Sequence, residues 1–118
     1  MGKNQDIHQR IYNFVLRVLR LLQALPKTAI NLNIINQCSR ATTSVGANDQ
    51  EADACIIKKD FISKYALVKK ELKETNYWLK LITDTNPRFS QRMRDLNQEA
   101  HELLLIISSI INKTKGGS

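Results

Sequence analysis

Residues 61–82 read FISKYALVKKELKETNYWLKLI, and the spacing of the large side chains in this stretch decides the fold class. These side chains recur alternately four and three residues apart, which places them along one side of an α-helix. The repeating positions are Phe61, Tyr65, Val68, Leu72, Thr75, Leu79 and Ile82. The same rhythm is typical of helices that pack almost side by side. The stretch therefore predicts a helix over about residues 58–83 that forms part of a helical bundle.

Three other stretches repeat this period. They predict helices over about residues 6–25, 28–52 and 87–112. Four helices of similar length with short connections are typical of an antiparallel up-down-up-down four-helix bundle. We therefore expect an all-α fold in which residues 1–118 form one domain, with a frayed tail over residues 113–118.

Helix starts are marked by residues that suit the N-cap. Asp6 and Thr28 precede the first two helices, and Asn86 followed by Pro87 is a start signal for the fourth. The start of the third helix has no such residue next to it. Glu51 or Asp53 is a candidate for its cap.

The chain is basic, with 18 Lys and Arg side chains against 11 Asp and Glu and a formal net charge of +7. Such a charge favours polyanionic partners or anionic membrane surfaces, although a solvated surface with excess lysine is the alternative. Arginines follow the polar face of the first helix and the start of the fourth. The candidates for nucleic-acid binding are Arg10, Arg17, Arg20, Arg88 and Arg92.

These arginines predict contacts to the phosphate backbone of RNA or DNA, with strong salt dependence. No aromatic side chain is interleaved with the basic residues, so stacking on single-stranded bases is not expected. The longest apolar run, residues 103–107, is too short to span a bilayer. Cys38 and Cys55 form no CxxC motif, which is typical of reduced cysteines. We expect a cytoplasmic protein with no membrane segment.

Residues 37–52, QCSRATTSVGANDQEA, are unusually small and polar for the middle of a helix. Small side chains let a neighbouring helix approach closely, and polar groups in a bundle can fix its register. If the second and third helices form a hairpin, Arg40 lies level with Glu71. Asn48 and Glu51 are expected to bond backbone N–H groups at residues 57–61. The predicted structural polar seam consists of Gln37, Arg40, Asn48, Glu51, Glu71 and Glu74; solvent exposure of half of these residues is the alternative.

Nothing in the sequence assembles a catalytic or cofactor site. His8 and His101 lie in no HxxxH or ExxH setting, and no glycine-rich phosphate loop is present. Glu71 and Glu74 could form half of a carboxylate metal site, but the other half is missing. We expect a protein that is not an enzyme and that needs no metal or other cofactor.

The first and fourth helices carry more apolar side chains than one bundle seam uses. The additional residues are Leu16, Leu19, Leu22, Leu104, Leu105, Ile106 and Ile111. Apolar surface of this kind usually marks an interface, so we expect a homo-oligomer.

Several motifs resemble the four-helix-bundle family encoded in intervening sequences of bacterial 23S ribosomal RNA genes. They are SRATTSVGANDQEA (residues 39–52), KDFISKYALVKKELKETNYWLKLI (residues 59–82) and, more loosely, LPKT (residues 25–28). Within them, the specific residues are Arg40, Ser44, Asn48, Glu51, Ala52, Asp60, Phe61, Lys64, Glu71, Glu74 and Trp78. One departure is Ile57, where the family often has a serine cap.

The resemblance implies an up-down bundle that assembles as a ring-shaped homopentamer. For the intervening-sequence branch it implies no established biochemical activity. A relative is the accessory variability determinant of diversity-generating retroelements, which implies a basic barrel that binds nucleic acid and a reverse transcriptase. Two functions therefore follow as expectations: binding of nucleic acid through a basic surface, or a structural adaptor for a protein partner such as a reverse transcriptase.

Overall fold

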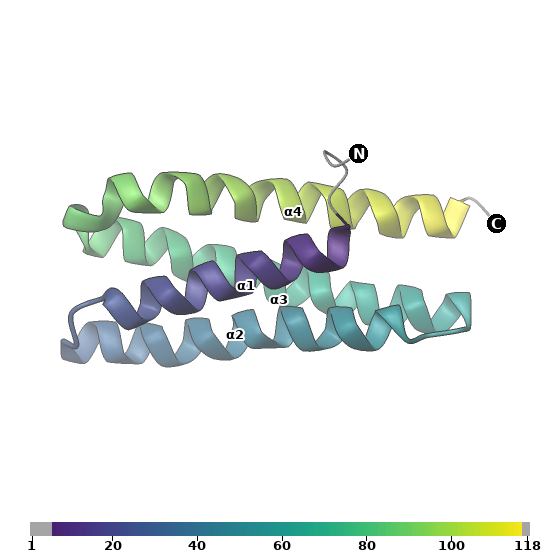
Figure 1. Ribbon diagram of the computed structural model, residues 1–118, viewed down its shortest axis with the longest axis horizontal. Helices are drawn as coiled ribbons and strands as arrows, with labels where there is room; N and C mark the ends of the chain where they lie inside the picture. The colour runs from purple at the N-terminus through teal and green to yellow at the C-terminus, as the bar shows by residue number, and fades with distance from the viewer. Residues whose placement is uncertain (1–5, 117–118) are drawn as a thin grey trace.

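The structure, a computed structural model that describes residues 6–116, is an all-α bundle of four long helices (Figure 1). They are α1 (Ile7–Ala24), α2 (Ala29–Asp53), α3 (Lys58–Thr85) and α4 (Ser90–Gly116). A short 3-10 helix, η1 (Pro87–Phe89), leads into α4. The α1–α2 and α3–α4 connections lie at one end of the bundle and the α2–α3 connection at the other. The predicted up-down-up-down fold is confirmed.

Helix ends differ from the expectation mainly in α4. This helix begins at Ser90 because residues 87–89 form the 3-10 turn, and it continues to Gly116. The tail expected to fray from residue 113 is therefore helical up to Gly116. Two lysines in the last turn favour this extension because they interact well with the helix C-terminus. Residues 117 and 118 lie outside the described part of the chain.

Only one of the expected caps forms a side-chain hydrogen bond. The Thr28 hydroxyl oxygen accepts from the Asn31 backbone N–H at 3.1 Å, as predicted. Asp6 occupies the N-cap position of α1, but its side chain makes no cap bond. Ile57 occupies the N-cap position of α3, and no side chain caps that helix. The expectation that Glu51 or Asp53 caps α3 is therefore wrong.

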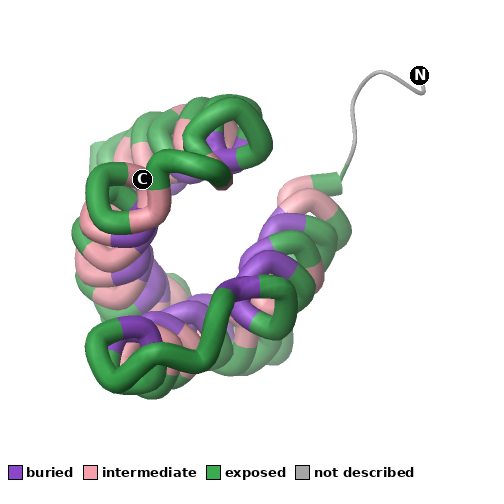
Figure 2. Tube along the Cα trace, turned by 90° about the vertical axis from the view of Figure 1, so that its left-hand side faces the viewer, coloured by how far each residue is buried: buried purple, intermediate pink, exposed green. Residues whose placement is uncertain are grey.

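The buried residues lie on the inner sides of the helices, as the purple segments of Figure 2 show. On α3, Tyr65, Val68, Leu72, Thr75, Leu79 and Ile82 are all buried, as the repeat predicts. Phe61, at the start of that repeat, is half-buried. On α4, Ile111 is buried and Ile110 is half-buried against the core.

Two amide side chains tie the two neighbouring connections together. The amide of Asn31, which is 4% exposed, donates to the Pro26 carbonyl at 2.8 Å and to the Asn86 side-chain oxygen at 3.0 Å. Asn86 donates back to the Asn31 side-chain oxygen at 3.1 Å. This reciprocal pair fixes the α1–α2 connection beside the α3–α4 connection. It thereby sets the positions of the basic residues that flank both connections.

Candidate functional site

Arg10 joins α1 to α4 through two carboxylates. Its Nε donates to Glu99 Oε2 at 2.8 Å, and its Nη2 donates to Glu99 Oε1 at 2.9 Å and to Glu102 Oε1 at 2.7 Å. The bond to Glu99 is the main reason why the pKa of Arg10 is raised. The pKa of Glu102 is lowered, first by a hydrogen bond from Gln98 and then by the bond from Arg10. Arg10 was a candidate for phosphate binding, but its guanidinium is already occupied within the chain.

The next arginines along the same two helices have no such carboxylates. Arg17 follows Arg10 by seven residues on α1, and Arg92 precedes Glu99 by seven residues on the antiparallel α4. Seven residues make about two turns, so Arg17 and Arg92 lie on the helix sides that Arg10 and Glu99 use for their contact. Within residues 6–116, neither arginine makes an ion pair.

Arg20 and Arg88 lie one turn farther toward the same end of the bundle. All four side chains are exposed. We call them the arginine surface: Arg17, Arg20, Arg88 and Arg92. The Arg92 guanidinium lies 6.0 Å from the centroid of the Phe89 ring, a cation–π distance that helps to hold it in place. Figures 1 and 2 show that α1 diverges from α4 toward this end, so the two helices that carry these arginines are farther apart here than at Arg10.

Basic residues are concentrated around the two connections. Residues 17–40 and 80–95 together contain eight Lys or Arg side chains and two Asp side chains. This excess of six positive charges accounts for most of the +7 of the whole chain. The remainder of the chain is therefore nearly neutral. An anion is attracted to the end of the bundle that carries the connections.

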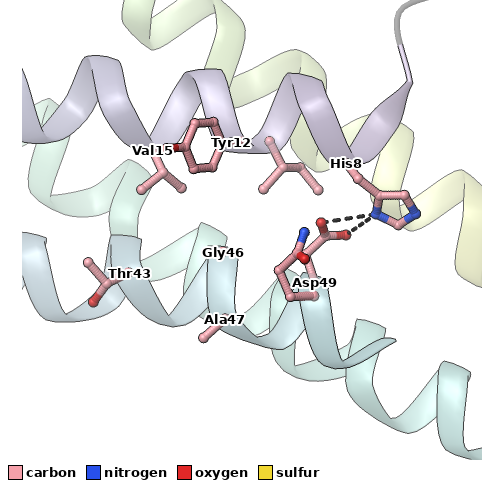
Figure 3. Close-up of a pocket in the computed structure, with 9 residues that line it drawn as sticks. His8, Tyr12, Val15, Thr43, Gly46, Ala47 and Asp49 are labelled. Atoms are coloured by element: carbon pink, nitrogen blue, oxygen red, sulfur yellow. Dashed lines mark hydrogen bonds and ion pairs between the residues drawn. The ribbon is translucent and has the colours of Figure 1, made fainter. Parts of the chain in front are cut away.

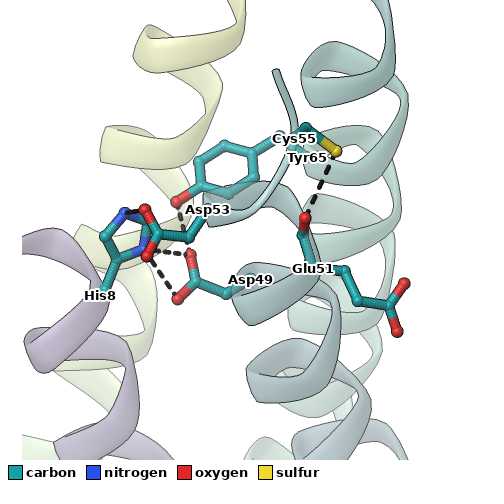
Figure 4. A network of polar contacts seen from close by, with 6 residues as sticks. All are labelled: His8, Asp49, Glu51, Asp53, Cys55 and Tyr65. Carbon is teal, nitrogen blue, oxygen red and sulfur yellow. Dashed lines mark hydrogen bonds and ion pairs between the residues drawn. The ribbon is translucent and has the colours of Figure 1, made fainter. Parts of the chain in front are cut away.

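A buried polar network occupies the region where α1 begins (Figure 4). Asp49 is only 1% exposed, and both of its carboxylate oxygens lie within 3.0 Å of His8 Nδ1. The Tyr65 hydroxyl donates to Asp49 Oδ1 at 2.6 Å. On its other side, His8 Nε2 lies 3.0 Å from Asp53 Oδ1. The network joins α1, α2 and α3 at one point.

The network shifts the titration of two of its members. Partial burial disfavours the charged form of His8, but the hydrogen bond to Asp49 and the charges of Asp49, Asp53 and Asp6 outweigh it. The pKa of His8 is therefore raised. Burial, followed by the bond to Asp49, also raises the pKa of Tyr65. Tyr65 thus remains a protonated donor, and carboxylates at both ring nitrogens of His8 favour its protonated form.

A cavity of about 260 Å³ lies beside the network, between α1 and α2 (Figure 3). Its wall is mostly apolar and includes Ile11, Tyr12 and Val15 of α1 together with Gly46 and Ala47 of α2. His8 and Asp49 stand at one end, where they are bonded to each other. Since both oxygens of Asp49 already have partners, the arrangement is suited to holding the helices together rather than to accepting a substrate proton.

The polar seam predicted between α2 and α3 forms different bonds from those expected. The Arg40–Glu71 pair is absent from residues 6–116, because the exposed Arg40 instead donates to Gln37 one turn away on α2. Glu74 accepts from Trp78 Nε1 at 3.1 Å, within α3. A solvated side chain gains little from reaching across to another helix.

The predicted role of Asn48 and Glu51 is also wrong. The Asn48 amide donates to the Ser44 carbonyl at 2.9 Å, within its own helix. Glu51 accepts from Lys64 Nζ at 2.5 Å, and this hydrogen bond is the main reason why the pKa of Lys64 is raised. Neither side chain bonds backbone N–H groups at residues 57–61. Glu51 does join α2 to α3, but through a side chain one turn farther along α3.

Sequence reasoning missed the polar contacts that join His8, Asp49 and Tyr65. Asp49 occupies a position in the buried stripe of α2, between Val45 and Ala52. A carboxylate in such a stripe needs donors, and this was the available signal. The partners could not be identified because His8 and Tyr65 lie 41 and 16 residues away in the chain.

The extra apolar side chains of α1 and α4 are largely used within the bundle. Leu22 and Ile111 are buried, while Leu19 and Leu104 pack against the core. Leu105 alone of the expected set is a large exposed apolar residue, at 57%. Further exposed apolar side chains occur on α1, α2 and α3 and in the α2–α3 connection: Tyr12, Ile30, Leu32, Ile56, Ile57, Leu67 and Tyr77.

Membrane spans and metal sites are both missing from residues 6–116. No helix in this part of the chain is long and apolar enough to cross a membrane. The same residues contain no group of three or more His, Cys, Asp or Glu side chains that could hold a metal ion. Cys38 is buried, and this burial raises the pKa of its thiol to about 11, so it is a poor nucleophile.

Comparisons with known proteins agree with the fold. A family described as 23S rRNA-intervening sequence protein matches residues 3–109. A crystal structure of a protein of unknown function from the S23 ribosomal protein family of Bacteroides thetaiotaomicron is similar at a TM-score of 0.80 and 29% sequence identity, over 90% of this chain and 95% of that chain. No curated protein matches the chain.

Proposed function

Because the chain belongs to the 23S rRNA-intervening sequence protein family, we propose that it is a homo-oligomeric bundle that binds the backbone of RNA or DNA through the arginine surface. It acts by binding rather than by catalysis. The same proposal includes two points that the resemblance implies. The oligomer is a pentamer, and the chain is related to the retroelement accessory protein.

The observation that carries this proposal is the contrast along the α1–α4 contact. At Arg10, two glutamates of α4 neutralise the guanidinium. Two turns away, Arg17 of α1 and Arg92 of α4 point their charges to solvent without a carboxylate partner among the described residues. Exposed arginines without carboxylate partners create a positive potential at this end of the bundle, and a bound polyanion would neutralise it.

Arginine suits a phosphate ligand for geometric reasons. Its planar guanidinium donates two parallel hydrogen bonds to phosphate oxygens, and it stays charged at every physiological pH. Phosphate contacts carry no base information, so binding should depend weakly on sequence and strongly on salt. The arginine surface therefore predicts a backbone-binding protein and leaves the choice between RNA and DNA to experiment.

Homo-oligomer formation is supported by the apolar side chains that the single chain leaves exposed. Ile30, 67% exposed, lines a hollow of about 470 Å³ between α2 and α3 together with Trp78 and Leu81. A second copy that covered these side chains would remove them from water. In a closed ring, every copy would repeat the arginine surface, so that weak phosphate contacts would add through multivalency.

A second candidate function is that of an adaptor for a protein partner such as a reverse transcriptase. The α2–α3 connection favours it, because Ile56 is 98% exposed and Ile57 is 60% exposed there. This connection lies at the opposite end of the bundle from the other two connections (Figure 1). A protein partner could therefore bind at this end without covering the arginine surface.

The test is direct binding of labelled RNA and DNA over a series of salt concentrations, with the oligomeric state measured by light scattering. The proposal predicts an oligomer whose affinity falls steeply with salt and changes little with sequence. A monomer at micromolar concentration would reject the assembly. Absence of binding to RNA and DNA even at low salt would reject the nucleic-acid function and favour the adaptor.

A further inference from the structure

The solvent face of α3 carries a row of lysines with one aromatic side chain among them. Lys70, Lys73, Tyr77 and Lys80 are spaced by three, four and three residues, so they share one side of the helix. All four side chains are exposed, and the Tyr77 ring is 56% exposed. Lys59, at the start of the helix, falls on the same side and is also exposed.

On α3, Glu74 and Lys80 lie on different sides of the helix. Glu74 accepts from Trp78, which lines the hollow against α2, so this glutamate lies toward α2. Lys80 instead lines a hollow on the side of α4. Within residues 6–116, Lys70, Lys73 and Lys80 make no ion pair. Asp84, one turn beyond Lys80, is the acidic residue that shares their side of the helix.

The Tyr77 ring is held in place by a neighbouring side chain. Its ring packs edge-on against Trp78, with ring centroids 5.0 Å apart and an angle of 70° between the planes. Trp78 is in turn held by its bond to Glu74. A ring that is fixed on one side and open on the other can serve as a stacking platform.

A polar hollow of about 260 Å³ lies beside this platform, between α3 and α4. It is lined by Asn76, Lys80, Thr83, Asp84, Asn97 and His101. The Asn97 amide donates to the Thr83 hydroxyl at 2.9 Å, whereas the Asn76 amide has no side-chain partner in the described part of the chain. Amide and hydroxyl groups of this kind can bond the edge of a base or a ribose hydroxyl.

We propose that α3 carries a second site, in which Tyr77 stacks on a base of single-stranded nucleic acid while Lys70, Lys73 and Lys80 contact the neighbouring phosphates. The sequence-based expectation that no aromatic residue is interleaved with basic ones overlooked the helical period, which places Tyr77 between Lys73 and Lys80. The site extends the proposed function and rests on it for the class of ligand. It uses a different helix face, and it adds a preference for single strands that the arginine surface does not have.

Trp78 offers a local readout because it is the chain's single tryptophan and its ring packs against Tyr77. The experiment titrates the full chain with a single-stranded oligouridylate and with an RNA duplex of the same length, and follows Trp78 fluorescence and the anisotropy of the labelled nucleic acid. The single strand should change Trp78 emission. Tyr77→Ala should weaken single-strand binding about 5- to 150-fold, while Tyr77→Phe should keep it. Duplex binding should stay unchanged in both variants.

Three results would overturn the second site. If Tyr77→Ala bound the single strand as tightly as the natural chain, the second site would be rejected. If the duplex still bound, the proposal for the arginine surface would be unaffected. A changed oligomeric mass for Tyr77→Ala in light scattering would assign Tyr77 to a contact between copies. Absence of binding to both nucleic acids at low salt would reject this site together with the proposed function. Because Tyr77 is exposed, an unchanged helical melting curve serves as the folding control.

Discussion

The two ends of the α1–α4 contact carry arginines in opposite circumstances. Near the start of α1, Arg10 bonds Glu99 and Glu102, and His8 bonds Asp49 and Asp53 on α2. Near the end of α1, Arg17 and Arg20 are exposed, and no ion pair forms at either within residues 6–116. Residues of the same type thus serve the fold in one region and are available to a partner in the other. Substitutions in the two regions should separate stability from binding.

The largest expected effect is on stability, at the paired end. Asp49→Ala should lower the free energy of unfolding by about 2–4 kcal/mol, because it leaves the buried Tyr65 hydroxyl and His8 without their acceptor. Urea unfolding measures this. The matched control is Asp53→Ala, which removes a 57% exposed carboxylate and should cost less than about 1 kcal/mol. Equal losses of unfolding free energy in the two variants would show that the burial of Asp49 does not determine its contribution to stability.

A smaller effect is expected at Arg10. Arg10→Gln should destabilise the fold by about 1–2 kcal/mol, since it breaks a two-pronged bond to the part-buried Glu99. Arg17→Gln, two turns away, should change stability by less than about 0.5 kcal/mol. Thermal or urea unfolding of both variants tests the contrast between the two regions. If Arg17→Gln were the more damaging change, the assignment of the two arginines would be reversed.

His8 should make the paired end sensitive to pH. Because its pKa is raised in the folded state, its stabilising contribution is fully present below the unfolded pKa of about 6.5 and is lost as pH rises through the folded pKa. The stability difference between the natural chain and His8→Gln should therefore be larger at pH 5.5 than at pH 8.5. Asp6, Asp49 and Asp53 are the titratable groups that influence His8. A stability difference that grew with pH would contradict the raised pKa of His8.

A small gain in stability is expected between the two regions, at Gly46. A Cβ atom there would lie 3.4 Å from Val15 Cγ2, at the edge of ordinary van der Waals contact. Gly46→Ala should therefore raise stability by about 0.5–1 kcal/mol, because alanine is the better helix former. The melting temperature measures this gain. A loss of stability would show that α1 and α2 need the close approach expected from the small residues of α2.

The fold was predictable because the four-three spacing of apolar residues needs no knowledge of tertiary contacts. Thr75 in the α3 repeat is buried, as its position indicated. The polar contacts were much less predictable. The Arg40 side chain can bond Glu71, solvent or Gln37 on its own helix. The periodicity of the sequence does not indicate which of these partners it takes, and in the structure it is Gln37.

Paired and unpaired arginines also look the same in the sequence. Arg10 and Arg17 occupy equivalent positions on α1, seven residues apart. What distinguishes them is the register of α4, which brings Glu99 and Glu102 to Arg10. Likewise, Tyr77 could be placed among lysines from its spacing, but its support by Trp78 and its exposure came only from the structure.

The most direct test of the contrast between paired and unpaired arginines is the salt dependence of nucleic-acid binding. The logarithm of duplex affinity is measured against the logarithm of salt concentration for the natural chain, for Arg10→Gln and for a variant with Arg17, Arg20, Arg88 and Arg92 changed to Gln. The fourfold variant should remain folded and its slope should flatten by about 0.9 for each phosphate that it no longer neutralises, while Arg10→Gln keeps the natural slope. An unchanged slope in the fourfold variant, or an equal flattening in Arg10→Gln, would contradict the assignment of the arginine surface to binding.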